Sequence, residues 1–279
     1  MSRSFGGASV REALDSAVIA ISAAGSDTPR LDAELLLAHA LGVDRAALVT
    51  DPGREVTGPA VRAFQDAVRR RSAGREPVAL ILGRRGFRHI ELRVDGRALV
   101  PRPESELLVE VALELDDGAR VVDVGTGTGA IALALKHERP DLDVVATDVS
   151  ADALALAREN AARLGLDVEL LHGDLLAGCE AVDAVLCNPP YVAERDRATL
   201  APEITRHEPP GALFAGPDGL DVIRRLVPAA AASAARLLAI EVGAGQAEEV
   251  AALVRGGGFA SVDRRRDLAG IERVVIGTR

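Results

Sequence analysis

The stretch VVDVGTGTGA, residues 121–130, decides the fold of this 279-residue chain. Its apolar, β-branched beginning predicts a buried strand that ends near Val124. Three glycines follow at once: Gly125, Gly127 and Gly129. Glycines let a backbone turn sharply and come close to a ligand. The apolar run GAIALALKH, residues 129–137, then predicts a helix. A strand, a glycine loop and a helix in this order indicate an open α/β sheet.

Strands and helices alternate along the chain from Pro101 onward. We expect strands over residues 119–124, 143–148, 168–173, 182–190 and 236–242, and two more near 259–264 and 272–277. We expect helices over residues 103–115, 129–137, 151–165, 220–234 and 246–257. Such alternation predicts parallel strands with helices on both faces. The fold class is therefore α/β, with a doubly wound, mostly parallel sheet of seven strands and ligands at the carboxyl ends of the strands.

The chain before Pro101 has a different pattern. Residues 9–73 show apolar positions at helical spacing, interrupted near Gly25–Pro29, Gly42 and Asp51–Gly53, which predicts a small domain of about four helices. Residues 76–101 alternate apolar and polar side chains around Asp95–Gly96, which predicts a β-hairpin. We therefore expect a helical domain at 1–75, a hairpin linker at 76–101 and a catalytic domain at 102–279.

Composition and charge exclude several classes of protein. Hydrophobic residues make up 48 % and charged residues 27 %, which indicates a globular chain rather than a disordered one. Residues 1–75 have a net charge of +1 and residues 76–279 one of −10, which together give the formal charge of −9. An acidic body argues against sequence-independent phosphate binding. We interpret six arginines within residues 84–102 as solvated surface.

The cysteines, histidines and aromatic residues narrow the possibilities further. Cys179, Cys187 and the five histidines show no metal-ligand spacing, so we expect neither a metal nor a disulfide. We find no leader pattern and no uninterrupted apolar span, so we expect a cytoplasmic protein without membrane contact. Aromatic residues make up only 2 %, with Tyr191 as the one tyrosine. The core must therefore consist of Ala, Leu and Val.

An acidic residue stands at the end of the strand that follows the glycine loop and its helix. Asp148 ends the next strand, 19 residues after Gly129, where a carboxylate can accept hydrogen bonds from ribose hydroxyls. Together they predict a nucleoside-binding site. The spacing of Gly125, Gly127 and Ala130 also satisfies the nicotinamide fingerprint, so a dinucleotide oxidoreductase stays possible at this point. Asp123, two residues before the first glycine, favours instead a cofactor that has a free amino group.

The second motif is AVLCNPPY, residues 184–191. Pro189 and Pro190 have no N–H, so the chain must leave the sheet there in a rigid conformation. That conformation presents the Asn188 side-chain carbonyl and the Pro189 backbone carbonyl as two fixed acceptors. The two N–H groups of a planar amide or amine match them, and holding both would aim the nitrogen lone pair at a sulfonium methyl. Tyr191 would supply a flat apolar wall.

These motifs together resemble one enzyme family. The segment D-x-G-T-G-x-G, residues 123–129, resembles the first motif of class I S-adenosylmethionine-dependent methyltransferases. The N-P-P-Y loop resembles that of enzymes that methylate adenine N6, cytosine N4 or glutamine N5. The whole chain is similar to the peptide chain release factor glutamine methyltransferases, above all in PRPESE (101–106), EPPGALFAGPDGL (208–220) and EVGAGQ (241–246). Ser105 replaces the family's Thr, Ala215 replaces a Gly, and Ala79-Leu80 replaces Gln-Tyr.

The resemblance implies a class I methyltransferase domain at 102–279, joined by a β-hairpin to a helical substrate-docking domain at 1–75. It implies S-adenosylmethionine as cofactor, released as S-adenosylhomocysteine, and held by Gly125, Thr126, Gly127, Thr128, Gly129, Asp148, Asp174, Leu175 and Asn188. It implies Asn188, Pro189 and Tyr191 as catalytic residues. The substrate glutamine would be held by Asn188, Pro189, Pro190 and Tyr191.

The resemblance also implies a partner and a product. The substrate would be the glutamine of the Gly-Gly-Gln motif in class I release factors, methylated at N5 in support of translation termination. We expect a monomer that makes no direct contact with nucleic acid. Two further alternatives stay open at this stage: an amino-methyltransferase acting on nucleic acid, and a cofactor-binding module without turnover.

Overall fold

The computed structural model describes residues 7–279, which form two compact units. The first unit contains the described residues up to Gly83 together with Pro202–His207, and the second contains Arg84–Ala201 and Glu208–Arg279. Each unit has its own buried apolar core. The units therefore divide at Gly83, between the boundaries expected at residues 75 and 101.

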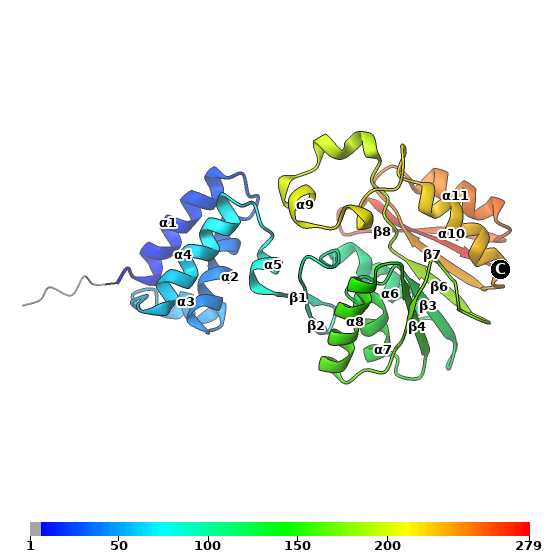
Figure 1. Cartoon of the computed structure of the whole chain (residues 1–279), viewed down its shortest axis with the longest axis horizontal. Coiled ribbons are helices and arrows are strands. Elements are labelled where there is room, and N and C mark those ends of the chain that lie inside the picture. Colours follow the sequence, from blue (N-terminus) through cyan, green and yellow to red (C-terminus); the bar gives the residue numbers. More distant parts are fainter. Residues whose placement is uncertain (1–6) are drawn as a thin grey trace, which may run out of the picture. The chain divides into compact units, whose positions relative to one another are not determined.

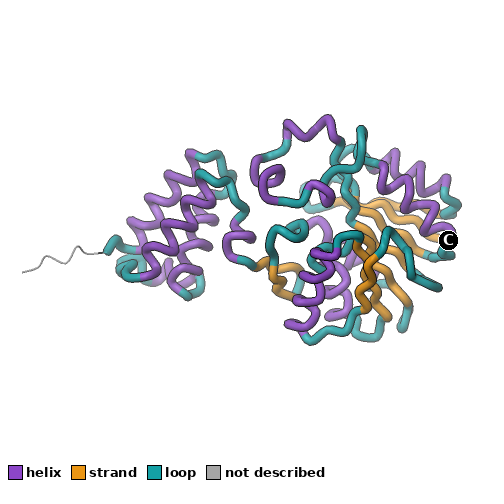
Figure 2. The backbone as a smooth tube through the Cα atoms, viewed as in Figure 1, coloured by secondary structure: helices purple, strands orange, loops and turns teal. Residues whose placement is uncertain are grey.

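The first unit is helical (Figures 1 and 2), as its apolar spacing predicts. Its helices are α1 (Val10–Ala23), α2 (Pro29–Leu41), α3 (Arg45–Thr50), α4 (Pro59–Ser72), α5 (Val78–Leu82) and α9 (Pro202–His207). Helix α1 begins with a capping box, in which Ser9 and Glu12 each accept a backbone N–H of the other. Helix α2 ends at Gly42, whose φ of 63° is unfavourable for other residues. Ile21, Leu36 and Leu37 are fully buried between the helices.

A buried arginine joins α9 to the rest of this unit. Arg71 of α4 is only 8 % exposed. Its guanidinium lies 2.6 Å from Asp32, 2.8 Å from Glu203 of α9 and 2.9 Å from the Ser26 hydroxyl. The His207 ring lies 2.8 Å from the backbone carbonyl of Gly74. Residues 202–207, for which the sequence pattern predicts no helix, thus form a helix that belongs to the helical unit.

The second unit is built on a seven-stranded sheet of order β5-β4-β3-β6-β7-β9-β8. Its strands are β3 (Arg120–Val124), β4 (Asp143–Asp148), β5 (Glu169–His172), β6 (Ala184–Cys187), β7 (Leu237–Glu241), β8 (Ser261–Arg266) and β9 (Glu272–Thr278). The five neighbouring strands β5, β4, β3, β6 and β7 pair in parallel. Strand β9 is antiparallel to both of its neighbours, β7 and β8. The predicted doubly wound, mostly parallel sheet is confirmed.

Helices cover both faces of the sheet (Figure 1). One layer contains α6 (Glu106–Ala112), α7 (Ala130–Glu138) and α8 (Ala151–Leu164), and the other contains α10 (Asp221–Ala232) and α11 (Ala247–Gly256). Short 3₁₀ turns are η1 (Pro103–Ser105), η2 (Glu194–Thr199) and η3 (Pro210–Ala212). Alternate residues of the strands enter the two cores, Val121 in one and Val122 in the other. None of the helices within residues 7–279 is long and apolar enough to cross a membrane.

The hairpin lies at a different place from the one predicted. Strands β1 (Arg84–Phe87) and β2 (Ile90–Arg93) pair across a turn at Arg88–His89. The chain does turn at Asp95–Gly96, but no strands pair across that turn, so the predicted position of the hairpin is wrong. The apolar run at 78–82 is not a strand but helix α5, because its side chains pack on the helical core of the first unit. The hairpin is also no independent linker, since Phe87, Ile90 and Leu92 are buried in the core of the second unit.

The buried Arg71 gives a test of how the helical unit is held together. Replacing it with alanine (Arg71→Ala) would leave the buried Asp32 without a cation and Glu203 paired with Arg75 alone, so we expect the unfolding free energy of this unit to fall by about 3 kcal/mol. Urea unfolding followed by circular dichroism measures this change. Arg69→Ala is the matched control, since that side chain is 72 % exposed. Equal effects of the two variants would contradict the stabilising role assigned to the buried Arg71.

Candidate functional site

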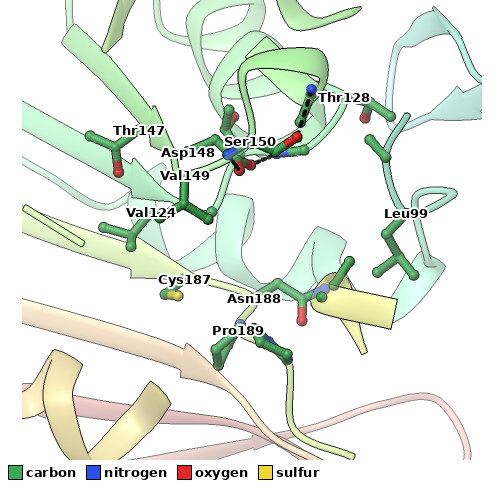
Figure 3. A pocket seen from close by; sticks show the side chains of 18 of the residues that line it. Leu99, Val124, Thr128, Thr147, Asp148, Val149, Ser150, Cys187, Asn188 and Pro189 are labelled. Carbon is green, nitrogen blue, oxygen red and sulfur yellow. Dashed lines mark hydrogen bonds between the residues drawn. The ribbon is translucent and has the colours of Figure 1, made fainter. Parts of the chain in front are cut away.

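A cavity of about 440 Å³ opens in the second unit where β3, β4 and β6 end. Val124, Asp148 and Cys187, the last residues of these strands, all line it. Figure 3 shows Asp148, Val149 and Ser150 on one side of the space and Asn188 and Pro189 on another. The position agrees with the rule that ligands bind at the carboxyl ends of parallel strands.

The glycine loop forms part of the cavity wall. Gly125 and Gly127 line the cavity, with φ angles of 72° and 57° that favour glycine. A Cβ added at Gly125 would meet no protein atom within 4 Å, so the loop leaves open space beside it. The backbone N–H groups of Gly125 and Thr126 donate to the Thr147 carbonyl at 2.9 and 3.0 Å, which holds the loop against β4. Thr126 and Thr128 also line the cavity.

Gly129 lies outside the cavity lining. It is the residue before α7 and has a φ of 84°. A Cβ added there would stand 2.8 Å from the Leu133 side chain and 3.3 Å from that of Ala157. The third glycine therefore permits close packing between the loop and helices α7 and α8, which is a structural task rather than a ligand contact.

Asp148 supports the loop while facing the cavity. One carboxylate oxygen accepts the Gly127 backbone N–H at 2.9 Å, and the other accepts the Ser150 N–H at 2.8 Å (Figure 3). Each carboxylate oxygen can accept a second hydrogen bond. Asp148 can thus hold the loop and still accept hydrogen bonds from ligand hydroxyls.

Asp123 lies buried at the base of the loop, with 1 % of its surface exposed. Its Oδ2 accepts the Thr126 hydroxyl at 2.6 Å and the Ala132 N–H at 3.2 Å. Its Oδ1 has no hydrogen-bond partner among the described residues. Burial, opposed by these hydrogen bonds and assisted by the nearby Asp148 charge, raises the pKa of Asp123 to about 6. Asp123 does not itself line the cavity, so its carboxylate would act on a cationic ligand group through the loop that it supports.

Asp174 and Leu175 line the cavity beyond β5. Leu175 has a φ of 54°, and its carbonyl accepts the Thr147 hydroxyl at 2.7 Å. Asp174 forms an ion pair with Arg225, which also lines the cavity. Asp174 and Leu175, which are expected to hold the cofactor, are therefore next to the same space as the glycine loop.

The NPPY turn closes another side of the cavity. Asn188, Pro189 and Pro190 line it, whereas Tyr191 does not. Tyr191 lies behind the turn. Its hydroxyl is 3.3 Å from Glu241, and its backbone carbonyl accepts the Gln246 side-chain N–H at 3.0 Å. The structure thus brings Asn188, Pro189 and Pro190 to the same cavity as the glycine loop, whereas the Tyr191 side chain bonds to Glu241 at the end of β7.

The sequence analysis did not identify two candidate functional residues, Ser105 and Glu241. The Asn188 side-chain NH₂ donates to the Ser105 hydroxyl at 2.9 Å, and Ser105 lines the cavity. The Ser105 hydroxyl in turn donates to Glu241 at 2.6 Å. Burial raises the pKa of Glu241 to about 7, although hydrogen bonds from Ser105 and Tyr191 oppose that shift. The segments 101–106 and 241–246 were noticeable as family motifs, but nothing in their spacing shows that they meet.

Other residues singled out in the sequence have structural roles. Five of the six clustered arginines pair with carboxylates: Arg84, Arg88, Arg93, Arg97 and Arg102. Arg102 lines the cavity and lies 2.7 Å from the buried Glu208. Burial raises the pKa of the Cys187 thiol well above its usual value, so this thiol is a weak nucleophile. Within residues 7–279 no group of His, Cys, Asp or Glu has the arrangement of a metal site.

The sheet order, the glycine loop after β3, the acidic end of β4 and the NPPY turn after β6 define a class I S-adenosylmethionine-dependent methyltransferase. Family models agree: one described as "Methyltransferase small domain" matches residues 103–214, and one described as "PrmC N-terminal domain" matches residues 12–83. This result removes the dinucleotide oxidoreductase as an alternative.

Curated relatives narrow the class to one family. A release factor glutamine methyltransferase of Deinococcus radiodurans is 44 % identical over 272 residues, which cover 95 % of this chain and 97 % of that one. One of Caulobacter vibrioides is 42 % identical, over 92 % of this chain and 91 % of that one. A solved methyltransferase from Pyrococcus furiosus, at 18 % identity, shares the fold with a TM-score of 0.52, over 67 % of this chain and 87 % of that one. The chain belongs to the release factor glutamine methyltransferase family.

The buried Glu241 predicts how stability depends on pH. Its pKa is raised from an ordinary value of 4.5 to about 7, so its contribution to stability is complete below pH 4.5 and is lost as the pH rises through 7. Between pH 5 and pH 8 the wild type should lose on the order of 2 kcal/mol more unfolding free energy than Glu241→Gln does. Urea unfolding at both pH values measures this difference. Glu180→Gln, at an exposed position, is the control and should behave as the wild type does.

Proposed function

We propose that this protein transfers a methyl group from S-adenosylmethionine to N5 of the glutamine in the Gly-Gly-Gln motif of class I release factors. The observation that carries the proposal is the NPPY turn, whose Asn188 and Pro189 line the same cavity as the glycine loop. Family membership supports the substrate, because the curated relatives bear the name release factor glutamine methyltransferase.

The residues around the cavity fit the proposed cofactor. Gly125, Thr126, Gly127 and Thr128 would hold its methionine part, with the spare Asp123 oxygen near the base of the loop. Asp148 would accept the ribose hydroxyls. Asp174 and Leu175 would flank the adenine. Gly129 would act through the loop's shape, since it packs against Leu133. When bound, this cofactor supplies an electrophilic methyl group on a sulfonium.

Asn188 and Pro189 would orient the nucleophile. The Asn188 side-chain oxygen and the Pro189 backbone carbonyl would each accept one N–H of the substrate amide. With both hydrogens held, the nitrogen lone pair is aimed at the methyl group, which is catalysis by orientation. Transfer would form a new N–C bond and break the C–S bond of the cofactor, so that a neutral thioether would leave and one amide proton would pass to solvent. Pro190 and Tyr191 would complete the substrate side of the turn, with the Tyr191 hydroxyl held by Glu241 at 3.3 Å.

The remaining roles follow from the two units and their charges. The helical unit would dock the release factor. The net charge of −10 over residues 76–279 favours a protein substrate over a nucleic acid. We further propose that the enzyme acts as a monomer in the cytoplasm, where release factors work.

The substrate assignment is tested by methyl transfer from labelled cofactor to a purified class I release factor. Transfer should be lost when the Gln of the Gly-Gly-Gln motif is replaced. Asn188→Ala should lower kcat/KM at least about 100-fold, since one of the two acceptors is removed, while the protein stays folded. Transfer that survives the glutamine replacement, or labelling of RNA or DNA instead, would contradict the proposal.

The cofactor assignment is tested by calorimetric titration with S-adenosylmethionine. Asp148→Ala removes both the ribose acceptor and the loop's hydrogen bond through Gly127, so we expect binding to weaken about tenfold or more. Asp152→Ala, at an exposed position of α8, is the control and should bind as the wild type does. Unchanged affinity in Asp148→Ala would rule out its assigned role.

A further inference from the structure

A chain of hydrogen bonds runs from the substrate side of the cavity into the core. It leads from the Asn188 amide to the Ser105 hydroxyl at 2.9 Å, and from there to Glu241 at 2.6 Å. Ser105 is 4 % exposed and Glu241 is 1 % exposed, so the hydrogen bond between these two side chains is shielded from water. The other Glu241 oxygen accepts the Tyr191 hydroxyl at 3.3 Å. One carboxylate thus contacts both ends of the NPPY turn, directly at Tyr191 and through Ser105 at Asn188.

We propose that Glu241 is a positioning residue which, through Ser105, fixes which end of the Asn188 amide faces the substrate. This inference rests on the proposed function, because it assumes that Asn188 accepts a hydrogen bond from the substrate amide. It adds to that function a reason why Asn188 presents oxygen rather than nitrogen.

The reason is the direction in which each hydrogen bond can run. An ionised carboxylate only accepts, so the Ser105 hydroxyl must donate its one hydrogen to Glu241. Ser105 can then only accept from its other neighbour, and the only donor on the Asn188 side chain is its NH₂ group. The Asn188 Oδ1 is thereby left for the substrate. The amide cannot flip without placing two acceptors against each other.

Protonation of Glu241 removes this constraint. A neutral Glu241 can donate to Ser105, which frees the Ser105 hydroxyl to donate to Asn188 Oδ1. The amide can then turn its NH₂ toward the substrate, where two N–H groups would oppose each other.

The charged or titratable groups around Glu241 are Glu104 of η1, Arg273 of β9, Cys187 of β6 and Tyr191. Arg273 is the one cation in this group, and its guanidinium forms a salt bridge with Asp267 at 2.9 Å rather than with Glu241.

The kinetic test compares two replacements of one hydroxyl. Ser105→Ala breaks the chain, and we expect kcat for release factor methylation to fall about tenfold or more. Ser105→Thr keeps the hydroxyl and should stay within about threefold of wild type. Full activity in Ser105→Ala, or equal losses in both variants, would show that packing and not the hydroxyl matters, and would overturn the proposal.

The pH test uses Glu241→Gln. Because the ionised carboxylate is required, wild-type kcat/KM should fall as the pH drops through about 7, the raised pKa of Glu241. Glu241→Gln should be less active above pH 7 and should lack this titration. A wild-type profile with no change between pH 6 and pH 8, or the same profile in the variant, would refute the role of Glu241.

A spectroscopic test separates this inference from the proposed substrate. The chain has only two asparagines, Asn160 and Asn188, so asparagine-selective ¹⁵N labelling gives two side-chain amide signals. The Asn188 signals should shift with a midpoint near pH 7 in the wild type and stay constant in Glu241→Gln. Asn160 is the internal control, because it is buried and bound to Arg93 and Thr128 backbone groups.

The spectra do not depend on methyl transfer. If the titration of Asn188 is present but no release factor is methylated, the substrate assignment is wrong and the positioning role stands. If release factor is methylated but the Asn188 signals neither titrate nor change in Ser105→Ala, the positioning role is wrong and the substrate assignment stands.

Discussion

The parallel pairing of β3 with β4 on one side and with β6 on the other determines where every loop of the site lies. Parallel strands end at the same edge of a sheet, so the glycine loop, Asp148 and the NPPY turn must meet there. The prolines after β6 make the meeting rigid, because they cannot extend the ladder and hold the chain in one conformation. The cavity is a consequence of this strand order.

Two buried carboxylates lie next to the residues that line the site, and within residues 7–279 neither forms a salt bridge with a cation. Asp123 and Glu241 are each 1 % exposed, and burial raises the pKa of both. In their ionised forms they lower the stability of the fold near neutral pH. An apolar replacement would pack more favourably, yet each carboxylate accepts hydrogen bonds that shape the site: Asp123 from Thr126 of the loop, Glu241 from Ser105 and Tyr191. Stability is thus exchanged for a defined polar geometry.

The loop after NPPY connects the site to the helical unit through the chain itself. Residues 202–207 leave the sheet-based unit and pack with α4, where Arg71 binds Glu203. On either side of this helix, the chain belongs to the unit that holds the cavity, and Pro209, Gly211 and Ala212 line the cavity itself. The segment that follows the NPPY turn therefore contributes residues to both units.

The sequence by itself determined the elements that depend on local pattern. Strand and helix periodicity predicted the seven strands and the five main helices of the second unit, and the residues Gly125, Gly127, Asp148 and Asn188 were found by motif and spacing. Only the tertiary structure decided the contacts between distant segments. Ser105 and Glu241 are 136 residues apart, and Arg71 and Glu203 are 132 apart. It also moved the hairpin turn to Arg88–His89 and placed Tyr191 behind the site. Periodicity reports which face of an element is buried, but it does not say against which other element that face packs, because the partner is chosen by the packing of the whole core.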